Sequence, residues 1–436
     1  MKNIQTPTLF QAARHKLRQP WSGFEERLTL HDNQVILISL MAPFVMLVFN
    51  EVVFQLTLPT MRDVFQIRAD VVAWIMTAYT LPFMISMPLY GRLGDELGKR
   101  RLFVAGIITF VAGTLITVSA TNLFWFMVGR IIQGLGSAGV VPLSMAIIAQ
   151  RFPVQERGKA LGTWNSIGPV TNITAPLLVG LLVDYLNWRL AFGPVLLIGL
   201  GAAWVIWRWV PASSRKVELA GLATFDWPGV LLLTLTLTTF MFYLSSQQIT
   251  GVAALQDWRL LGLSLLLFTL FFIWEKRQIS PYIDLKLFTN KTFSRASICA
   301  GLRMFAMSGI SFIAPLYLAD IHQLNASTTG FVLVAHAGAL LFTMRLGGQL
   351  ADSWRSRRPV TAGMAIQTGA IASLALLPAT APLWAIALGL AIHGLSAGLS
   401  LAALHRASLG KVPAEKTGIA AGLYGLVRFA GTMLGP

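Results

Sequence analysis

The chain has 436 residues, of which 55% are hydrophobic and 12% are charged, and its formal net charge is +16. Soluble domains carry about 25% charged residues, so this composition excludes an ordinary soluble globular protein. Apolar runs of about 20 residues recur along the whole length, and each is long enough to cross about 30 Å of hydrocarbon. The positive charges fall in the short segments between these runs, which favours a membrane topology signal over nucleic-acid binding. Cys299 is the only cysteine, which excludes an intrachain disulfide and a cysteine metal cluster.

The order of polar and apolar stretches predicts an all-α polytopic membrane protein. Residues 1–34 are polar and basic, and we expect a cytoplasmic N-terminal segment that lies on the membrane surface. The apolar runs then form a six-helix half over 35–210, an inserted helix pair over 227–274, and a second half over 296–436 whose last span is missing. The predicted spans are 35–58, 71–90, 102–120, 123–149, 162–183, 190–210, 227–246, 258–274, 296–318, 328–349, 360–378, 383–404 and 417–436.

The distribution of basic residues predicts the orientation of these spans. With the N-terminus in the cytoplasm, most of the 34 Lys and Arg residues fall in segments on the cytoplasmic side. The opposite side then holds only Arg62, Arg68, Arg189 and Arg259. Positive residues are enriched in cytoplasmic loops, so we expect a multi-pass protein of the cell membrane with a cytoplasmic N-terminus.

One short motif occurs twice. Residues 91–101 read GRLGDELGKRR and residues 348–358 read GQLADSWRSRR, and both copies follow an apolar span. An internal repeat of this kind is typical of a transporter built from two halves. We predict that each copy forms a short basic turn that acts as a cytoplasmic latch between the halves; a static turn with a solvated basic face is the alternative. The positions assigned to this motif are Gly91, Asp95, Gly98, Arg100, Gly348, Asp352 and Arg357.

These stretches carry a family resemblance. Residues 91–101 resemble the loop between the second and third spans of the major facilitator superfamily, and residues 130–136 resemble its fourth-span arginine motif. Residues 175–180 resemble the glycine-proline motif of antiporters, and residues 225–229 open an extra pair of spans. Together they are similar to the fourteen-span drug:proton antiporter family, of multidrug efflux type, over nearly the whole chain. The resemblance implies a major facilitator fold with two inserted helices, and proton-coupled drug efflux.

The fifth predicted span is the helix of the antiporter motif that the resemblance implies. Gly168, Pro169, Pro176 and Gly180 let this helix bend and pack closely, and we interpret them as a gating or leak-sealing element. Ordinary close packing of a membrane helix is the alternative.

Glu51 is the one carboxylate well inside a predicted span. An ionised carboxylate at the bilayer centre costs about 2.5–3.5 kcal/mol on insertion scales, so an acid at this depth indicates a function. Arg130 lies at a similar depth in the fourth span, and we predict that Glu51 and Arg130 carry proton coupling. The alternatives are a Glu51 without a role and an Arg130 that snorkels outward and ties two spans together.

Five further residues within predicted spans are assigned to the substrate pathway. They are Asn50, Trp74, Tyr79, His336 and Arg428. Asn50 stands where the family usually has Asp, and a hydrogen bond between helices is its alternative role. A lone histidine in a span is more often an interior group with a satisfied hydrogen bond, and aromatic residues are common at membrane interfaces.

The sequence contains no nucleotide-binding glycine-rich run and no nucleophile–base or metal-ligand arrangement. We therefore expect neither an enzyme nor a bound cofactor or metal. The expected partners are a small-molecule substrate, protons and the lipid bilayer, without nucleic acid, and the expected state is a monomer. The predicted function is proton-coupled efflux of small amphipathic or cationic compounds by alternating access. The alternatives are a nutrient or metabolite symporter or uniporter, and a non-transporting membrane sensor or degenerate fragment.

Overall fold

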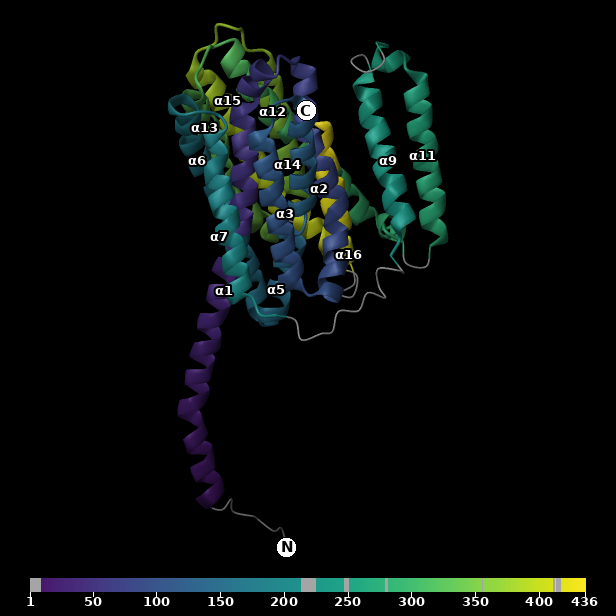
Figure 1. Cartoon of the computed structure of the whole chain (residues 1–436). Coiled ribbons are helices and arrows are strands. Elements are labelled where there is room, and N and C mark those ends of the chain that lie inside the picture. Colours follow the sequence, from purple (N-terminus) through teal and green to yellow (C-terminus); the bar gives the residue numbers. More distant parts are fainter. Residues whose placement is uncertain are drawn as a thin grey trace.

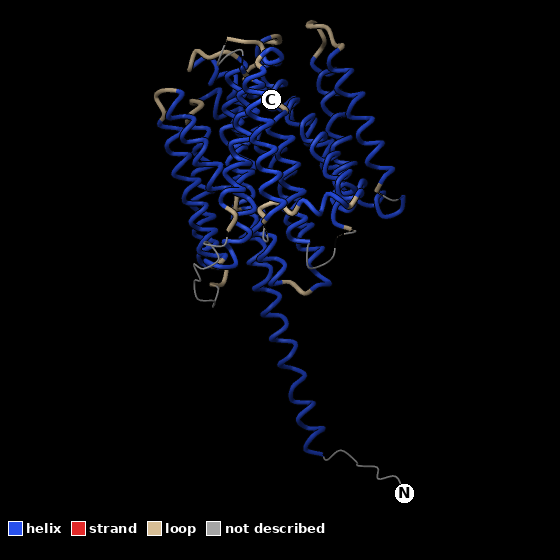
Figure 2. Tube along the Cα trace, turned by 90° about the vertical axis from the view of Figure 1, so that its right-hand side faces the viewer, coloured by secondary structure: helices blue, strands red, loops and turns tan. Residues whose placement is uncertain are grey.

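The computed structural model describes residues 9–212, 225–246, 251–278, 281–354, 356–410, 412 and 417–436. Within these residues the chain is helical and contains no strand (Figures 1 and 2). In this part of the chain, 11 segments are long and apolar enough to cross a membrane. Two shorter or less apolar helices, α14 (Arg357–Ala375) and α16 (Thr417–Leu434), match the remaining predicted spans. The predicted all-α membrane fold is confirmed.

The first half packs around a cluster of aromatic rings. Phe54 of the first helix makes edge-to-face contacts with Phe126 and Phe192, at ring-centroid distances of 6.0 and 5.0 Å. The fourth predicted span is divided between two helices that meet at residues 138–139. The helices of this half are α1 (Leu9–Val64), α2 (Ala69–Leu97), α3 (Lys99–Ser119), α4 (Leu123–Ser137), α5 (Val140–Arg151), α6 (Val154–Tyr185) and α7 (Gly193–Trp209).

The second half and the inserted pair follow. The inserted helices stand to one side of the main bundle, next to α2 (Figure 1). The pair consists of α9 (Trp227–Leu244) and α11 (Trp258–Arg277). The second half of the protein consists of α12 (Lys291–Asp320), α13 (Ala326–Trp354), α14 (Arg357–Ala375), α15 (Leu383–Leu409) and α16 (Thr417–Leu434).

Asp226, the N-cap residue of α9, connects the start of α9 to the end of α11. Its carboxylate accepts a hydrogen bond from the indole Nε1 of Trp274 in α11 at 2.7 Å, and another from the backbone N–H of Tyr282 at 3.1 Å. The Tyr282 hydroxyl in turn donates to the carbonyl oxygen of Ile85 in α2 at 2.6 Å. One carboxylate therefore joins both inserted helices to the segment that leads into the second half.

The N-terminal boundary differs from the prediction. Helix α1 begins at Leu9, so the polar N-terminal segment and the first span form one continuous helix. The predicted boundary near residue 34 lies inside this helix. Both views show this helix extending away from the bundle (Figures 1 and 2). No glycine or proline occurs between residues 24 and 42, so no helix breaker separates the polar stretch from the apolar one.

The repeated motif is more helical than predicted. Helix α2 continues through Gly91 to Leu97, and α3 starts at Lys99, so the turn is made at Gly98, whose φ is +89°. In the second copy, α13 ends at Trp354. The prediction of a turn over the whole motif was wrong, because most of its residues are good helix formers and only a positive φ requires glycine. The side chains of Asp95 and Asp352 lie outside the described residues.

The two halves repeat one close helix contact. In the first half, a Cβ atom at Gly134 of α4 would overlap the carbonyl oxygen of Tyr79 in α2. In the second half, a Cβ atom at Gly394 of α15 would overlap the carbonyl oxygen of His336 in α13. The internal repeat therefore extends from the basic motif to the packing of the membrane helices.

We predict that Gly394→Ala destabilises the protein, because the added methyl group meets backbone and not a movable side chain. Overpacking of this kind costs about 1–3 kcal/mol, which should lower the thermal unfolding midpoint of the purified protein in detergent. Gly369→Ala in α14 is the matched control, since a Cβ atom there meets nothing within 4 Å. Equal unfolding midpoints for the two variants would contradict the close approach of α13 and α15.

Candidate functional site

A cavity lies between the two halves. Helices α1 and α6 of the first half form one wall, and α12, α13 and α15 of the second half form the other. The lining mixes a few polar groups with many apolar ones, as is usual for a small-molecule site. The lining residues are Glu51, Val52, Gln55, Pro169, Asn172, Pro176, Met307, Ile310, Ser311, Leu333, His336, Ala337, Leu340 and Leu390.

Glu51 presents its carboxylate to this cavity. It is exposed and lines the cavity, whereas its neighbours in the chain, Asn50 and Val52, are 0% and 2% exposed. Among the described residues no cation lies within ion-pair distance of this carboxylate. Arg130 and Arg428 attract it electrostatically from opposite halves. The predicted Glu51–Arg130 partnership is thus an attraction through space and not a direct ion pair in this conformation.

Arg130 is held entirely by its own half. Its Nε donates to the carbonyl oxygen of Ile75 and its Nη1 to the Gln133 amide oxygen, both at 3.0 Å. The guanidinium carbon lies 3.5 Å from the ring centroid of Phe54 and 4.5 Å from that of Tyr79. This buried cation is therefore compensated by hydrogen bonds and aromatic faces.

His336 is the predicted pathway residue that lines the cavity. Its ring stacks on that of His393 in α15, with centroids 5.1 Å apart and Nδ1 atoms 3.3 Å apart. Its Nδ1 also lies 3.2 Å from the carbonyl oxygen of Leu390, and His393 Nε2 lies 3.3 Å from the Gln367 amide nitrogen. A row of polar side chains therefore leads from the cavity into the interior of the second half.

The other four predicted pathway residues are not among the residues that line this cavity. Asn50 is fully buried, and neither atom of its amide has a hydrogen-bond partner among the described residues. Trp74 packs on an aromatic ring of the inserted helix α9, and Tyr79 packs under the guanidinium of Arg130. Arg428 contacts α15.

Helix α6, the predicted antiporter-motif helix, forms part of the cavity wall. Pro169 and Pro176 line the cavity, and Gly168 lies against the ring of Phe44 in α1. The prediction missed Asn172, which lies three residues after one lining proline and four before the other. That spacing places all three on one face of a helix, so the signal was present in the sequence.

Helix α6 also makes the closest contact between the halves. A Cβ atom at Gly180 would approach the backbone of Ser327 in α13 to 2.6 Å, and one at Gly330 would approach the carbonyl oxygen of Pro176 to 2.6 Å. Asp184, near the end of α6, accepts hydrogen bonds from the N–H groups of the first two residues of α13 at 2.9 and 2.8 Å, and from the Ser327 hydroxyl. We call the end of the bundle where α6 ends and α13 begins the distal end.

Of the predicted positions in the repeated motif, Arg100 makes side-chain contacts, and they lie within its own half. Arg100 stacks on Trp207 of α7, and its Nη1 lies 3.4 Å from two carbonyl oxygens at the end of that helix. Nothing lies within 4 Å of a Cβ atom built on Gly91, and Gly348 has only an ordinary contact. Arg357 is exposed. A latch between the halves at these positions stays a prediction.

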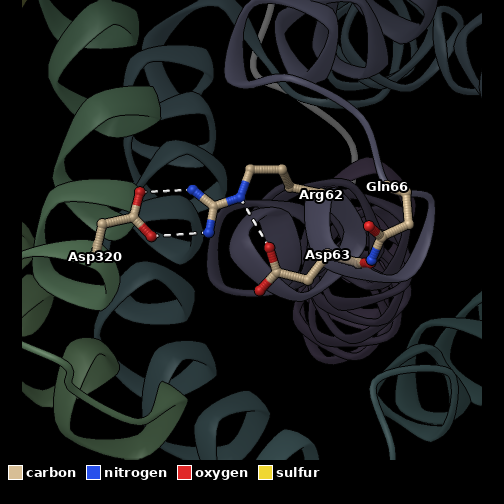
Figure 3. Close-up of polar contacts among 4 residues, drawn as sticks. All are labelled: Arg62, Asp63, Gln66 and Asp320. Atoms are coloured by element: carbon tan, nitrogen blue, oxygen red, sulfur yellow. Dashed lines mark hydrogen bonds and ion pairs between the residues drawn. The ribbon is translucent and has the colours of Figure 1, made fainter.

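A bidentate ion pair joins the halves at the distal end (Figure 3). Arg62 Nη1 and Nη2, near the end of α1, lie 2.5 and 2.8 Å from the carboxylate oxygens of Asp320, the last residue of α12. Arg62 Nε also donates to Asp63 of its own helix at 2.9 Å. This pair and the α6–α13 contact together close the distal end between the halves.

We predict that Asp320→Asn weakens closure of the distal end. An exposed pair is worth about 0.2–1 kcal/mol, so the open-to-closed ratio should rise by up to about fivefold. Spin labels on Tyr185→Cys and Ile321→Cys, in a Cys299→Ala background, report the distance between the halves by electron paramagnetic resonance.

Asp63→Asn is the matched control for this experiment. It removes an acid that contacts the same guanidinium of Arg62 but belongs to the same half. It should leave the distance distribution almost unchanged. An equal shift in both variants would mean that the ion pair does not hold the halves together.

Comparisons with known proteins agree on one family. The model of the Major Facilitator Superfamily matches residues 40–436. The chain is 26% identical to the riboflavin transporter RibZ of Clostridioides difficile (strain 630), covering 92% of this chain and 86% of that protein. It is 27% identical to multidrug resistance protein 3 of Bacillus subtilis (strain 168), covering 84% of this chain and 71% of that protein. It is 28% identical to the drug efflux pump JefA of Mycobacterium tuberculosis, covering 90% and 77%.

Solved structures share the fold. A peptide transporter in complex with sulfate superposes with a TM-score of 0.68 at 14% identity, covering 92% of this chain and 87% of that one. A D-xylose-proton symporter superposes with a TM-score of 0.64 at 14% identity, covering 92% and 88%.

Proposed function

Because this chain belongs to the Major Facilitator Superfamily and is therefore a membrane transporter, we propose that it exports small amphipathic or cationic compounds in exchange for protons. The transport follows the alternating-access scheme, in which the two halves rock around a central site. Two of the relatives are named for multidrug resistance or drug efflux, which supports this choice of substrate and direction.

The observation that carries the proposal is the position of Glu51 on the wall of the cavity between the halves. When ionised, this carboxylate attracts a cationic substrate; when protonated, it does not. Proton and substrate therefore compete for one site, and that competition produces exchange. The apolar lining, which includes Ile310 and Leu333, suits the body of an amphipathic compound.

The energetics of this exchange depend on the charge of the substrate. Exchange of one proton for one monovalent cation moves no net charge, so only the pH gradient drives it. Each pH unit then supplies about 1.4 kcal/mol, which supports a tenfold substrate gradient. Export of a neutral compound also uses the membrane potential, which adds about 2.3 kcal/mol per 100 mV.

A metabolite symporter is the second candidate. It is favoured by the relative named a riboflavin transporter, which aligns with most of this chain. The two candidates differ in the direction of proton movement when substrate is added to inverted membrane vesicles. Release of protons from acidified vesicles supports exchange, and co-uptake of protons supports the symporter.

We predict that Glu51→Gln abolishes concentrative export of a cationic dye such as ethidium. The glutamine amide retains the size of the side chain but neither ionises nor binds a proton, so the pH gradient is uncoupled. Accumulation in inverted vesicles should fall at least about tenfold, the gradient that one pH unit supports. Its residual rate should not respond to the imposed pH.

Glu156→Gln controls for the loss of an acid, since Glu156 is exposed near the start of α6. This variant should export the dye like the unaltered protein. If the Glu51→Gln variant keeps its dependence on the pH gradient, proton coupling lies at another residue and the assignment of Glu51 fails.

A further inference from the structure

The second half contains a group of buried and half-buried basic and aromatic residues that the proposed exchange does not use. The basic cluster, as we call it, comprises Arg303 of α12, His405 of α15, and Tyr424 and Arg428 of α16. Arg428 Nη1 lies 3.3 Å from His405 Nε2, and the rings of His405 and Tyr424 pack edge to face with centroids 5.2 Å apart. The charges of Arg303 and Arg428 repel one another.

The positive charge of this cluster has no direct counterion. Among the described residues, no carboxylate lies within ion-pair distance of Arg303 or Arg428. Arg303 is only 3% exposed, and its Nη1 contacts the thioether sulfur of Met307 at 2.6 Å. The acid that attracts Arg428 is Glu51, which belongs to the other half. Unpaired buried cations are strongly unfavourable, so this arrangement calls for an anion.

Two further polar atoms of the cluster have no hydrogen-bond partner. The hydroxyl of Tyr424 is one, although this residue is 5% exposed, and Nε of Arg428 is the other. Buried donors are nearly always paired, so two orphans beside an uncompensated guanidinium indicate a missing acceptor.

The first half shows that this situation is not a general property of buried arginines in the chain. Arg130 is buried and has no carboxylate within ion-pair distance among the described residues, but its hydrogen bonds go to Ile75 and Gln133 and its planar face is covered by Phe54. Two nitrogen atoms of Arg130 therefore have oxygen acceptors, whereas Nε of Arg428 and the hydroxyl of Tyr424 have no partner among the described residues. This difference favours a ligand over a structural role for the basic cluster.

The cluster adjoins the central cavity. Met307, which contacts Arg303, also lines the cavity, and Arg428 retains part of its accessible surface. We propose that the basic cluster binds the carboxylate of an amphipathic organic anion or zwitterion whose apolar body lies in the cavity. A zwitterion would place its cationic group at Glu51 and its carboxylate at Arg428, across the two halves. The proposal refines the substrate class given above and rests on that function for its physiological role.

Binding of a matched pair of probes tests this site without transport. The purified protein in nanodiscs is titrated by calorimetry with 2-naphthoate, an anion, and with 2-naphthamide, its neutral analogue, and empty nanodiscs serve as the blank. Naphthoate should bind at least about tenfold more tightly than naphthamide, because charge-assisted hydrogen bonds are the stronger kind. Arg428→Gln should remove this preference, and Arg428→Lys should retain part of it.

Further variants separate the site from the fold and from the proposed coupling. Tyr424→Phe loses no hydrogen bond that the described structure contains, so it should keep its unfolding midpoint and weaken naphthoate binding by about threefold to tenfold. Arg259→Gln, at an exposed arginine of α11, should bind like the unaltered protein. Glu51→Gln should bind naphthoate at least as tightly as the unaltered protein, even where it abolishes export.

Three results would overturn the proposal. In the first, naphthoate and naphthamide bind equally well to the unaltered protein. In the second, a folded Arg428→Gln variant still prefers naphthoate. In the third, the unaltered protein binds chloride but not naphthoate. Loss of export in the Glu51→Gln variant bears on the coupling alone, so the two proposals fail separately.

Discussion

The contact between α6 and α13 is the constraint on which the rest of the structure depends. Glycines at Gly180 and Gly330 remove the side chains that would separate the helices, so backbone meets backbone across the two halves. Asp184 then accepts hydrogen bonds from the start of α13, where backbone N–H groups lack partners within the helix. The two prolines of α6, about one and three turns from Gly180, then lie in the wall of the cavity next to this contact.

The two halves share one architecture but treat buried charge differently. In the first half, the guanidinium of Arg130 is enclosed by hydrogen bonds and aromatic rings. In the second half, Arg428 contacts the His405 ring and stacks on Phe429, but its Nε has no hydrogen-bond partner among the described residues, and the one acid that attracts it projects from the first half. The attraction between Glu51 and Arg428 thus crosses the interface that must open and close during transport. In the proposed exchange, this attraction would link the charge state of the cavity to the arrangement of the halves.

The spans and the internal repeat could be predicted because both depend on local sequence. A run of apolar residues long enough to cross a bilayer signals a helix whatever its neighbours are. The choice of Glu51 as a candidate site residue also rested on local sequence, because it is the one acid well inside a predicted span, and the structure places it on the cavity wall. The helical course of the repeated motif was missed because the three glycines of residues 91–101 suggested a turn, whereas among them only Gly98 has a positive φ.

The composition of the cavity could not be predicted with the same success, because it depends on which helix faces meet across the halves. Trp74 has the residue type expected of a drug pocket, yet it packs on the inserted pair. Asn172 lines the cavity, although its residue type is unremarkable in a membrane helix. Likewise, the ion pair of Arg62 and Asp320 joins residues far apart in sequence, and no local pattern connects them.

The inserted helices have a consequence for the topology of the whole chain. They are joined at their base by the carboxylate of Asp226, so they form a hairpin that enters and leaves the bundle at the same end. An even number of crossings leaves the orientation of everything downstream unchanged. A hairpin can therefore be added between the two repeats without changing the orientation of the second repeat in the membrane. A single extra helix at the same place would reverse the orientation of α12 to α16.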